Sequence, residues 1–313
     1  MSRRMAAGTR LAVGTAIAGV LGVCVAAQTP TFEARIEVVY VDAFVTQGGL
    51  PVPALDASNF ELKDNGVPQR AELVTAESQP LSAALVFDTS GSVAGERLAA
   101  LRAAGEAFLD GLRDDDEIAL LGFNFEIELL VPPTGDKSAV RSALARLRGQ
   151  GSSAVMDALY AGLTVTEGPK RSLVVLFSDG QDNVSWLSER PMRLVAERSN
   201  AIVHVIGWQP PPPPPLPHLP GRAVQPTPIP REPDHIRALR QIAELTGGGF
   251  GEVESPERLR QAFAAIIERM NARYVLRYEP QGVPREGWHA IELRLRGAKG
   301  DIQTRRGYWV GPR

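Results

Sequence analysis

Oxygen-bearing side chains gather at three places in this sequence of 313 residues, each beside a regular apolar segment. They are Asp88, Ser90 and Ser92 after one apolar run, Asp179 after another, and Ser152 and Ser153 between the two. Carboxylates and hydroxyls with no His or Cys among them are the ligands of a hard divalent cation, Mg²⁺ above all, with Mn²⁺ or Ca²⁺ as alternatives. The sequence therefore predicts a metal-binding site, with no catalytic residue and no organic cofactor.

The positions of these side chains along the chain place them at one edge of a sheet. The runs 81–87 and 172–177 are almost continuously apolar, which is typical of strands buried on both faces. In open α/β sheets, ligands bind at the carboxyl ends of such strands. The alternative is that Asp88, Ser90 and Ser92 cap the following helix, but capping requires only one such residue.

Strands and helices alternate through the middle of the chain, residues 79–271. Apolar runs predict the strands, and apolar residues at helical spacing predict the helices between them. The predicted strands are 81–87, 117–123, 172–177 and 202–207, and the predicted helices lie near 98–112, 136–148, 153–166, 188–199, 234–246 and 255–270. This order indicates an α/β fold with a doubly wound, mostly parallel sheet. His204, on an apolar strand, is expected to be a core residue with its hydrogen bonds satisfied.

Both flanks of this domain are rich in strand patterns. Residues 28–78 contain a strand at 33–46 and a hairpin of 60–63 and 71–74 around Asn65-Gly66, a pair that tolerates positive φ. Residues 272–313 contain strands at 273–278, 288–295 and 302–310. Because three short strands alone bury little surface, we expect 28–78 and 272–313 to pack together as one smaller β-rich domain.

Two further segments are set apart by their composition. Residues 1–27 carry arginines before an uncharged apolar run and end in small residues, which predicts a secretory signal peptide. We therefore expect an exported protein, periplasmic or extracellular, with no transmembrane span after signal removal; a retained membrane anchor is the alternative. Residues 209–233 are rich in proline, which predicts an extended loop inserted between a strand and a helix.

Charge and missing motifs argue against several function classes. Lys and Arg number 34 against 36 Asp and Glu, without a basic block, so nucleic acid is not an expected partner. The sequence contains neither a Gly-x-Ser-x-Gly elbow nor a His-Glu-x-x-His motif. Ser90 stands where a phosphatase of the haloacid dehalogenase type needs its second acid. We therefore expect a protein that is not an enzyme.

The order and spacing of the oxygen-bearing residues resemble the von Willebrand factor type A family, whose metal-ion-dependent adhesion site contains Asp-x-Ser-x-Ser, a distant Thr and a distant Asp. The resemblance implies that Asp88, Ser90 and Ser92 form the first metal-binding loop and that Asp179 lies in the third. Ser153 stands where the family usually has Thr, and Ser152 is the alternative ligand. With the serines binding directly and the two aspartates acting through waters, a site holding Mg²⁺ would be electrically neutral.

The resemblance extends beyond the central domain. The segments Phe60–Gly66 and Gly307–Trp309 look like those of the bacterial von Willebrand type A-related proteins first noted in Acidobacteria. The resemblance implies a binding or adhesion protein that recognises a protein ligand, with an acidic residue of that ligand completing the coordination of Mg²⁺. The alternatives are a metal-dependent hydrolase of the phosphatase kind and a structural module in which the metal only stabilises the fold.

Overall fold

The computed structural model describes residues 38–74, 79–179, 182–209 and 233–311. The predicted signal peptide and nearly all of the proline-rich segment 209–233 lie outside these residues. Among the helices in the described ranges, none combines the length and the apolar character that crossing a membrane requires.

A six-stranded sheet forms the centre of the α/β part. In sheet order its strands are β11 (Phe250–Val253), β10 (Ile202–Trp208), β9 (Arg171–Ser178), β6 (Leu81–Asp88), β7 (Glu117–Phe123) and β8 (Ile127–Thr134). All neighbouring pairs are parallel except β7 and β8, which are antiparallel. The predicted doubly wound, mostly parallel sheet is therefore confirmed. Strands β8 and β11 were not predicted, and the largely exposed residues of β8 mark it as an edge strand.

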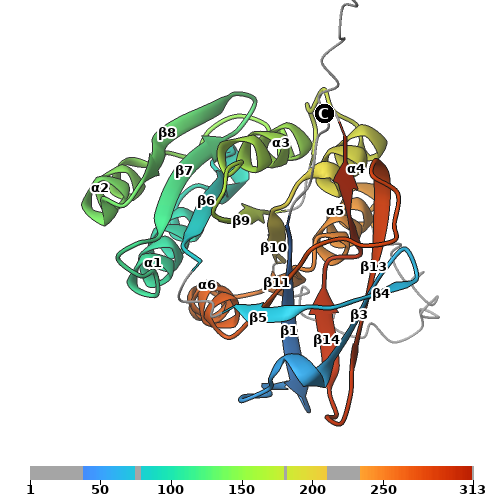
Figure 1. Ribbon diagram of the computed structural model, residues 1–313. Coiled ribbons are helices and arrows are strands. Elements are labelled where there is room, and N and C mark those ends of the chain that lie inside the picture. Colours follow the sequence, from blue (N-terminus) through green and yellow to red (C-terminus); the bar gives the residue numbers. More distant parts are fainter. Residues whose placement is uncertain (1–37, 75–78, 180–181, 210–232, 312–313) are drawn as a thin grey trace, which may run out of the picture. The chain divides into compact units, whose positions relative to one another are not determined.

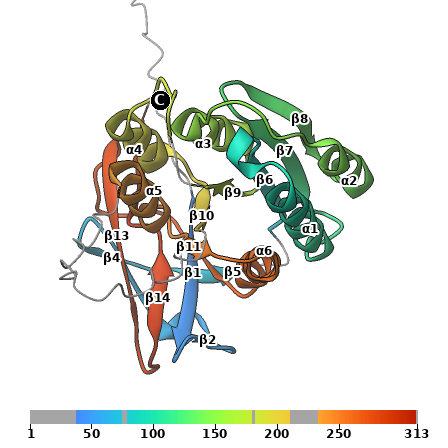
Figure 2. The same cartoon turned by 180° about the vertical axis from the view of Figure 1, so that it is seen from behind.

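Helices cover both faces of this sheet (Figure 1). The helices α1 (Glu96–Asp110), α2 (Lys137–Arg146) and α6 (Pro256–Asn271) share one apolar core with the sheet, and α3 (Val155–Val165), α4 (Glu189–Arg198) and α5 (Asp234–Leu245) share the other. Figure 2 shows the same two helical layers from behind. Helix α6 begins as its sequence predicts, because the Ser255 side chain accepts a hydrogen bond from the Arg258 amide and Pro256 occupies the first turn.

Strands from the two flanks of the chain pair with one another. One sheet has the order β14 (Asp301–Thr304), β1 (Val39–Gln47), β12 (Tyr274–Tyr278) and β5 (Glu72–Val74), with β2 (Leu50–Pro51) beside β1. The other has the order β15 (Gly307–Val310), β13 (Gly287–Leu295), β3 (Phe60–Asp64) and β4 (Val67–Gln69). Thus β1 pairs with β12 and β14, and β3 pairs with β13. These strands enclose a third apolar core, separate from the two beside the central sheet.

Two details of the predicted strand pattern are wrong. The turn at Asn65-Gly66 has the expected positive φ values of 46° and 79°, but its second strand is β4; residues 72–74 form β5, which pairs with β12. The predicted strand 302–310 is divided into β14 and β15, which lie in different sheets. The Arg306 amide between them bonds to the Leu245 carbonyl at 3.0 Å, so the break is where the chain meets the end of α5.

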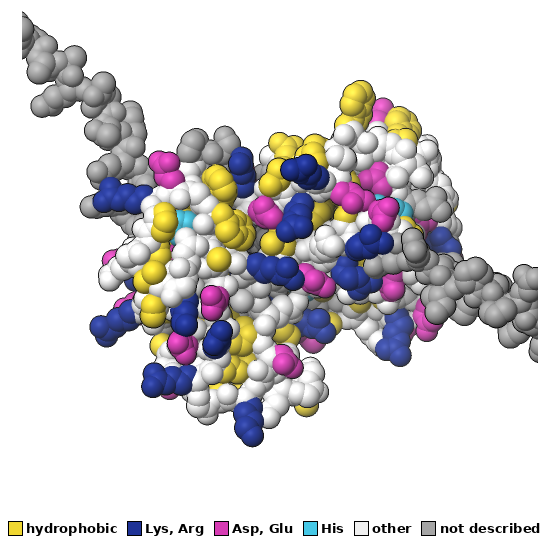
Figure 3. Space-filling view, turned by 90° about the vertical axis from the view of Figure 1, so that its right-hand side faces the viewer, with side chains coloured by type: hydrophobic (Ala, Val, Ile, Leu, Met, Phe, Trp, Pro, Cys, Tyr) yellow, Lys and Arg dark blue, Asp and Glu magenta, His cyan; other side chains and the backbone are white. Residues whose placement is uncertain are grey.

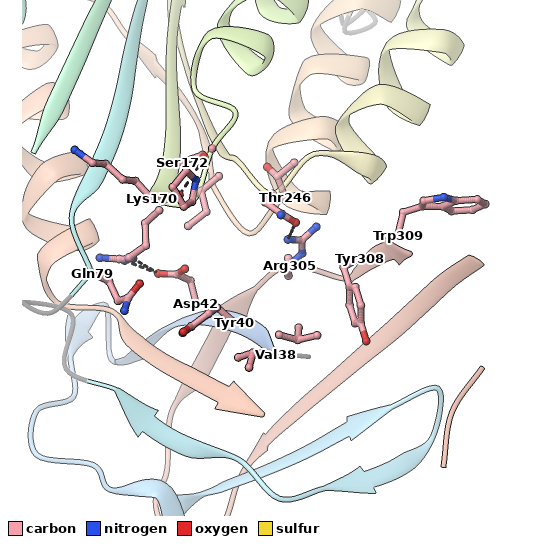
Figure 4. A pocket seen from close by; sticks show the side chains of 16 residues that line it. Val38, Tyr40, Asp42, Gln79, Lys170, Ser172, Thr246, Arg305, Tyr308 and Trp309 are labelled. Atoms are coloured by element: carbon pink, nitrogen blue, oxygen red, sulfur yellow. Dashed lines mark hydrogen bonds and ion pairs between the residues drawn. The ribbon is translucent and has the colours of Figure 1, made fainter. Parts of the chain in front are cut away.

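A cavity of about 180 Å³ lies where the β-rich strands meet the starts of β9 and β10, and Figure 4 shows its lining side chains. Arg171 donates through Nε to Oδ1 of Asp42 at 2.9 Å. Arg305, between β14 and β15, donates to the carbonyl of Ser199, which follows α4, at 2.9 Å. These contacts fasten the β-rich strands to the α/β part at the edge opposite the carboxyl ends of the parallel strands.

His204 is buried as predicted, but its hydrogen bonding is not satisfied. The side chain is 3% exposed, and its Nε2 has no hydrogen-bond partner among the described residues. Burial, with the nearby charges of Arg273 and Arg269, lowers the pKa of His204 to about 3. The imidazole is therefore neutral at physiological pH.

Charges on one face of the protein are mixed. On the face shown in Figure 3, Lys and Arg side chains are interspersed with Asp and Glu side chains, and neither sign forms a continuous patch. This face therefore offers no concentrated field for a polyanion.

Candidate metal centre

The register of β6 and β9 brings together two strand ends, one with a carboxylate and the other with a hydroxyl. Phe87 of β6 pairs with Phe177 of β9 in parallel register, so the next residues, Asp88 and Ser178, end adjacent strands side by side. Asp179 follows directly in the loop after β9. The candidate site thus lies at the carboxyl edge of the sheet, where the sequence places it.

Asp88 is the buried centre of the site. Its side chain is fully buried; Oδ1 accepts from the Ser90 amide at 2.9 Å, and Oδ2 accepts from the hydroxyls of Ser153 and Ser178, each at 2.8 Å. Burial raises the pKa of Asp88, and hydrogen bonds from Ser90, Ser153 and Ser178 offset part of that rise. Among the described side chains, none forms an ion pair with this carboxylate. A buried carboxylate held only by neutral donors is a favourable place for a cation.

The hydroxyls of Ser90 and Ser92 lie 3.0 Å apart. Two ligands at right angles around Mg²⁺, each at about 2.1 Å, are separated by about 3 Å, so this spacing matches one edge of the octahedron. Neither hydroxyl caps a helix: Ser90 makes no side-chain capping bond to the 3₁₀ turn Gly91–Val93, and the residue that caps α1 is Gly95. The capping alternative is therefore wrong for these serines.

Backbone hydrogen bonds tie the three loops of the site to one another. The Gly91 amide donates to the Gly151 carbonyl at 2.9 Å, and the Asn183 amide donates to the Ser153 carbonyl at 3.0 Å. Gly151 has a φ of 80°, and a Cβ there would lie 2.8 Å from the Phe125 ring, so only glycine fits. The loops form a scaffold that holds the serine side chains in place.

The two serines of the second loop differ in position. Ser153 is 2% exposed and its hydroxyl donates to Asp88, whereas Ser152 is exposed. The arrangement favours Ser153 over Ser152 as the ligand from this loop.

Within the part of the chain that the structure describes, Asp179 contacts the other site residues through Arg97, in the first turn of α1. Nη1 of Arg97 lies 3.6 Å from Oδ2 of Asp179 and donates to the Ser92 carbonyl at 3.1 Å. The structure therefore joins Asp88, Ser90, Ser92 and Ser153 by short contacts and places Asp179 at their margin.

Sequence reasoning did not identify Ser178 or Arg97 as parts of the site. Ser178 stands directly before Asp179, so a strand-end hydroxyl could have been suspected from the predicted edge. Nothing in the local pattern of α1 distinguishes Arg97 from an ordinary exposed arginine.

The donor set fits a hard cation. Ser90 and Ser92 offer hydroxyls at octahedral spacing, and the aspartates supply negative charge. Within the described part of the chain, no group of three or more His, Cys, Asp or Glu side chains could hold a metal ion. A site in these residues would therefore draw on hydroxyl oxygens as well as carboxylates.

Known proteins share this central region. Residues 83–181 match the family model of the von Willebrand factor type A domain, which spans β6 to the start of the loop after β9. "Uncharacterized protein sll0103" of Synechocystis is 24% identical over 217 residues, which is 64% of this chain and 46% of that protein. A UPF0353 protein of Mycolicibacterium paratuberculosis is 33% identical over 115 residues, 32% of this chain and 34% of its own length. The chain thus spans half or less of the length of these relatives.

The fold is also found in a solved structure. The von Willebrand factor type A protein from Catenulispora acidiphila superposes with a TM-score of 0.51 at 14% identity, covering 85% of this chain and 76% of that one. At this identity the likeness concerns the fold alone. The central α/β part therefore has the fold of a von Willebrand factor type A domain, and residues 83–181 within it match the model of that family.

Proposed function

We propose that this protein is a metal-dependent binding module that recognises an acidic residue of a protein ligand at the carboxyl edge of its central sheet. The single observation that carries the proposal is the buried carboxylate of Asp88, which neutral donors alone hold beside two hydroxyls 3.0 Å apart. This arrangement suits Mg²⁺ better than it suits a catalytic acid, because the carboxylate is not exposed to a substrate.

Each side chain has a distinct task in this proposal. Ser90 and Ser92 bind the ion directly, with Ser153 as a third hydroxyl. Asp88 and Asp179 act through waters and supply negative charge, while Ser178 orients the Asp88 carboxylate. When bound, Mg²⁺ supplies a concentrated positive charge with an incomplete protein shell, to which a carboxylate of the partner can bind.

We place this activity outside the cytoplasm, in the periplasm or the extracellular space. The support is the pattern of residues 1–27, with arginines, an apolar run and small residues at its end. Mass spectrometry of the exported protein should find a mature chain that starts near Gln28. An exported protein that retains Met1 would instead indicate a membrane anchor.

The experiment that tests the metal site compares wild-type protein with Asp88→Asn. Calorimetric titration with Mg²⁺ alone should show one site in wild type and none in the variant, because the variant lacks the central charge. Mg²⁺ binding that survives the substitution would contradict the proposal. Circular dichroism of both proteins separates loss of the site from loss of the fold.

The partner requires a second experiment on the same pair of proteins. Wild-type protein immobilised with Mg²⁺ should retain envelope proteins that EDTA releases, and Asp88→Asn should retain none of them. Retention that EDTA does not affect would argue against a metal-dependent module. Turnover of p-nitrophenyl phosphate that requires Mg²⁺ and is lost with Asp88→Asn would favour the hydrolase, and global unfolding on Mg²⁺ removal would favour a structural role.

A further inference from the structure

Arg97 is a cation at the edge of the candidate metal site that the family resemblance does not explain. Its Nη1 lies 3.6 Å from Oδ2 of Asp179 and donates to the Ser92 carbonyl at 3.1 Å, so the guanidinium touches two of the three loops. The Arg97 side chain is 31% exposed and that of Asp179 is 10% exposed. The pair is therefore partly accessible from solvent.

The position of Arg97 in its helix does not favour a positive charge. It is the second residue of α1, and the amino-terminal end of a helix dipole disfavours cations. The indole of Trp208 lies 5.8 Å from the guanidinium carbon and supports it from the side of β10. Contacts with Ser92, Asp179 and Trp208, from three other parts of the fold, thus hold this cation where its own helix disfavours it.

The ion pair with Asp179 is loose. A separation of 3.6 Å is longer than a charge-assisted hydrogen bond, which is usually about 2.7–2.9 Å. Among the described residues, none accepts a hydrogen bond from Nε or Nη2 of Arg97. The guanidinium therefore has donors available for a further oxygen ligand.

Arg97 also changes the charge of the site. The carboxylates of Asp88 and Asp179 with the guanidinium of Arg97 leave one net negative charge, and a divalent cation turns this into one net positive charge. The two aspartates and Mg²⁺ alone would give a neutral site, and Arg97 adds one positive charge to it. An anion approaching the metal-bound site would meet two positive groups, the ion and the guanidinium.

We propose that Arg97 is a second anion-recognition group, which pairs with Asp179 in the free protein and with the carboxylate of an acidic partner when the metal is bound. This inference rests on the proposed metal site. It assigns Arg97 two opposite effects: it weakens the binding of Mg²⁺ by repulsion and strengthens the binding of the carboxylate that follows. A purely structural arginine would not produce this pair of effects.

The test compares wild type, Arg97→Gln and Arg97→Lys in the full chain. Titration with Mg²⁺ alone should show binding about three- to tenfold tighter in Arg97→Gln, the range expected when a unit charge is removed near a partly exposed ion. Arg97→Lys should keep the wild-type affinity within about twofold, because it keeps the charge. Arg294→Gln, which removes a 69% exposed arginine on β13, is the matched control and should change nothing.

Carboxylate recognition is measured separately with trifluoroacetate as the probe. Fluorine NMR relaxation of this anion in the presence of Mn²⁺-loaded protein reports its approach to the metal. Enhancement should fall at least about threefold in Arg97→Gln and partly recover in Arg97→Lys. Weaker Mg²⁺ binding, or unchanged carboxylate binding, in Arg97→Gln would overturn the role of Arg97 and leave the metal site standing. Failure of the wild-type protein to bind Mg²⁺ would overturn both the role of Arg97 and the metal site itself.

Discussion

The phenol of Tyr308 donates a hydrogen bond of 2.7 Å to Oδ2 of Asp64, joining residues 244 positions apart in the sequence. Tyr278 donates to the same oxygen at 2.9 Å, and Nδ1 of His289 lies 2.9 Å from Oδ1. Asp64 and His289 are both almost completely buried. One carboxylate therefore connects strands from both flanks of the chain inside the β-rich part.

Replacing this carboxylate should destabilise the protein more than removing one of its donors. Asp64→Ala leaves several buried polar groups without their acceptor and should lower the free energy of unfolding by about 3–5 kcal/mol. Tyr308→Phe removes one hydrogen bond and should cost about 1 kcal/mol. Urea unfolding measures both, with Tyr160→Phe, at a 44% exposed tyrosine, as the control. An Asp64→Ala variant as stable as wild type would show that the network contributes little.

The same region shows where sequence reasoning succeeds and where it stops. The turn at Asn65-Gly66 follows from the backbone freedom of two adjacent residues, and it is confirmed. Asp64, next to it, has no local signal of burial, because its partners Tyr278 and Tyr308 come from strands at the other end of the chain. Local patterns define strands, but pairing between distant strands decides which polar residue is enclosed.

The candidate metal site also combines features that the sequence shows locally with features that depend on distant residues. The alternation of Asp88, Ser90 and Ser92 is local and could be read from the sequence. Ser178 and Arg97 contribute through the register of β6 and β9 and through the direction of a side chain across the sheet edge. Neither relationship is encoded in spacing along the chain.

Substitutions of the two serines in the second loop should change the affinity for Mg²⁺ differently. Ser153→Ala should weaken Mg²⁺ binding by about tenfold or more, because it removes a buried hydroxyl that bonds to Asp88. Ser153→Thr keeps the hydroxyl and should bind within about threefold of wild type. Ser152→Ala, at an exposed side chain, should leave the affinity unchanged in the same calorimetric titration. The reverse order of effects would assign the ligand to Ser152.

The buried charge of Asp88 should make the metal-free fold less stable as pH rises. Burial raises the pKa of Asp88 above its ordinary value of 3.8, so the folded state holds this proton more tightly than the unfolded state. The stability contributed by this proton is fully present below pH 3.8. It is lost as the pH rises through the pKa that Asp88 has in the folded protein. In EDTA at pH 7, Asp88→Asn should therefore be more stable than wild type, by on the order of 1 kcal/mol.

Thermal unfolding in EDTA between pH 4 and 8 measures this difference. The advantage of Asp88→Asn should grow with pH, and added Mg²⁺ should stabilise wild type only. Asp115→Asn, at a 52% exposed carboxylate, serves as the control and should follow wild type at every pH. A constant difference between Asp88→Asn and wild type would mean that Asp88 does not change its ionisation in this range.

His204 should lower the free energy of unfolding of the protein at acidic pH. Its pKa in the folded state is about 3, well below its ordinary value of 6.5, so the unfolded state binds this proton more readily. The contribution of the neutral His204 to stability is fully present above pH 6.5. It should fall by about 1.4 kcal/mol per pH unit as the pH decreases toward 3. His204→Phe should remove this part of the slope in urea unfolding between pH 7 and 5. His235→Gln should keep the wild-type slope; equal slopes in all three proteins would contradict the assignment.

The two helical cores and the β-rich core should be separable. The apolar clusters on the two faces of the central sheet use residues 81–270, whereas the third cluster uses only strands and loops of the two flanks. A fragment of residues 79–271 should therefore fold, and it should bind Mg²⁺ as the full chain does, because it contains every proposed ligand. It should also be less stable, since it lacks the ion pair of Arg171 with Asp42 and the packing of the β-rich strands around it.

Circular dichroism and thermal melting of the fragment measure both expectations. A cooperative transition several degrees below that of the full protein is the expected result, and Arg171→Met in the full protein should reproduce part of the loss, because it leaves the mostly buried Asp42 without its partner. Arg193→Met, at a 54% exposed arginine of α4, is the control in the full protein and should not reproduce it. A fragment that melts without cooperativity while the full protein melts sharply would mean that the α/β core depends on the β-rich strands, and that the contact of Asp42 with Arg171 belongs to one folding unit.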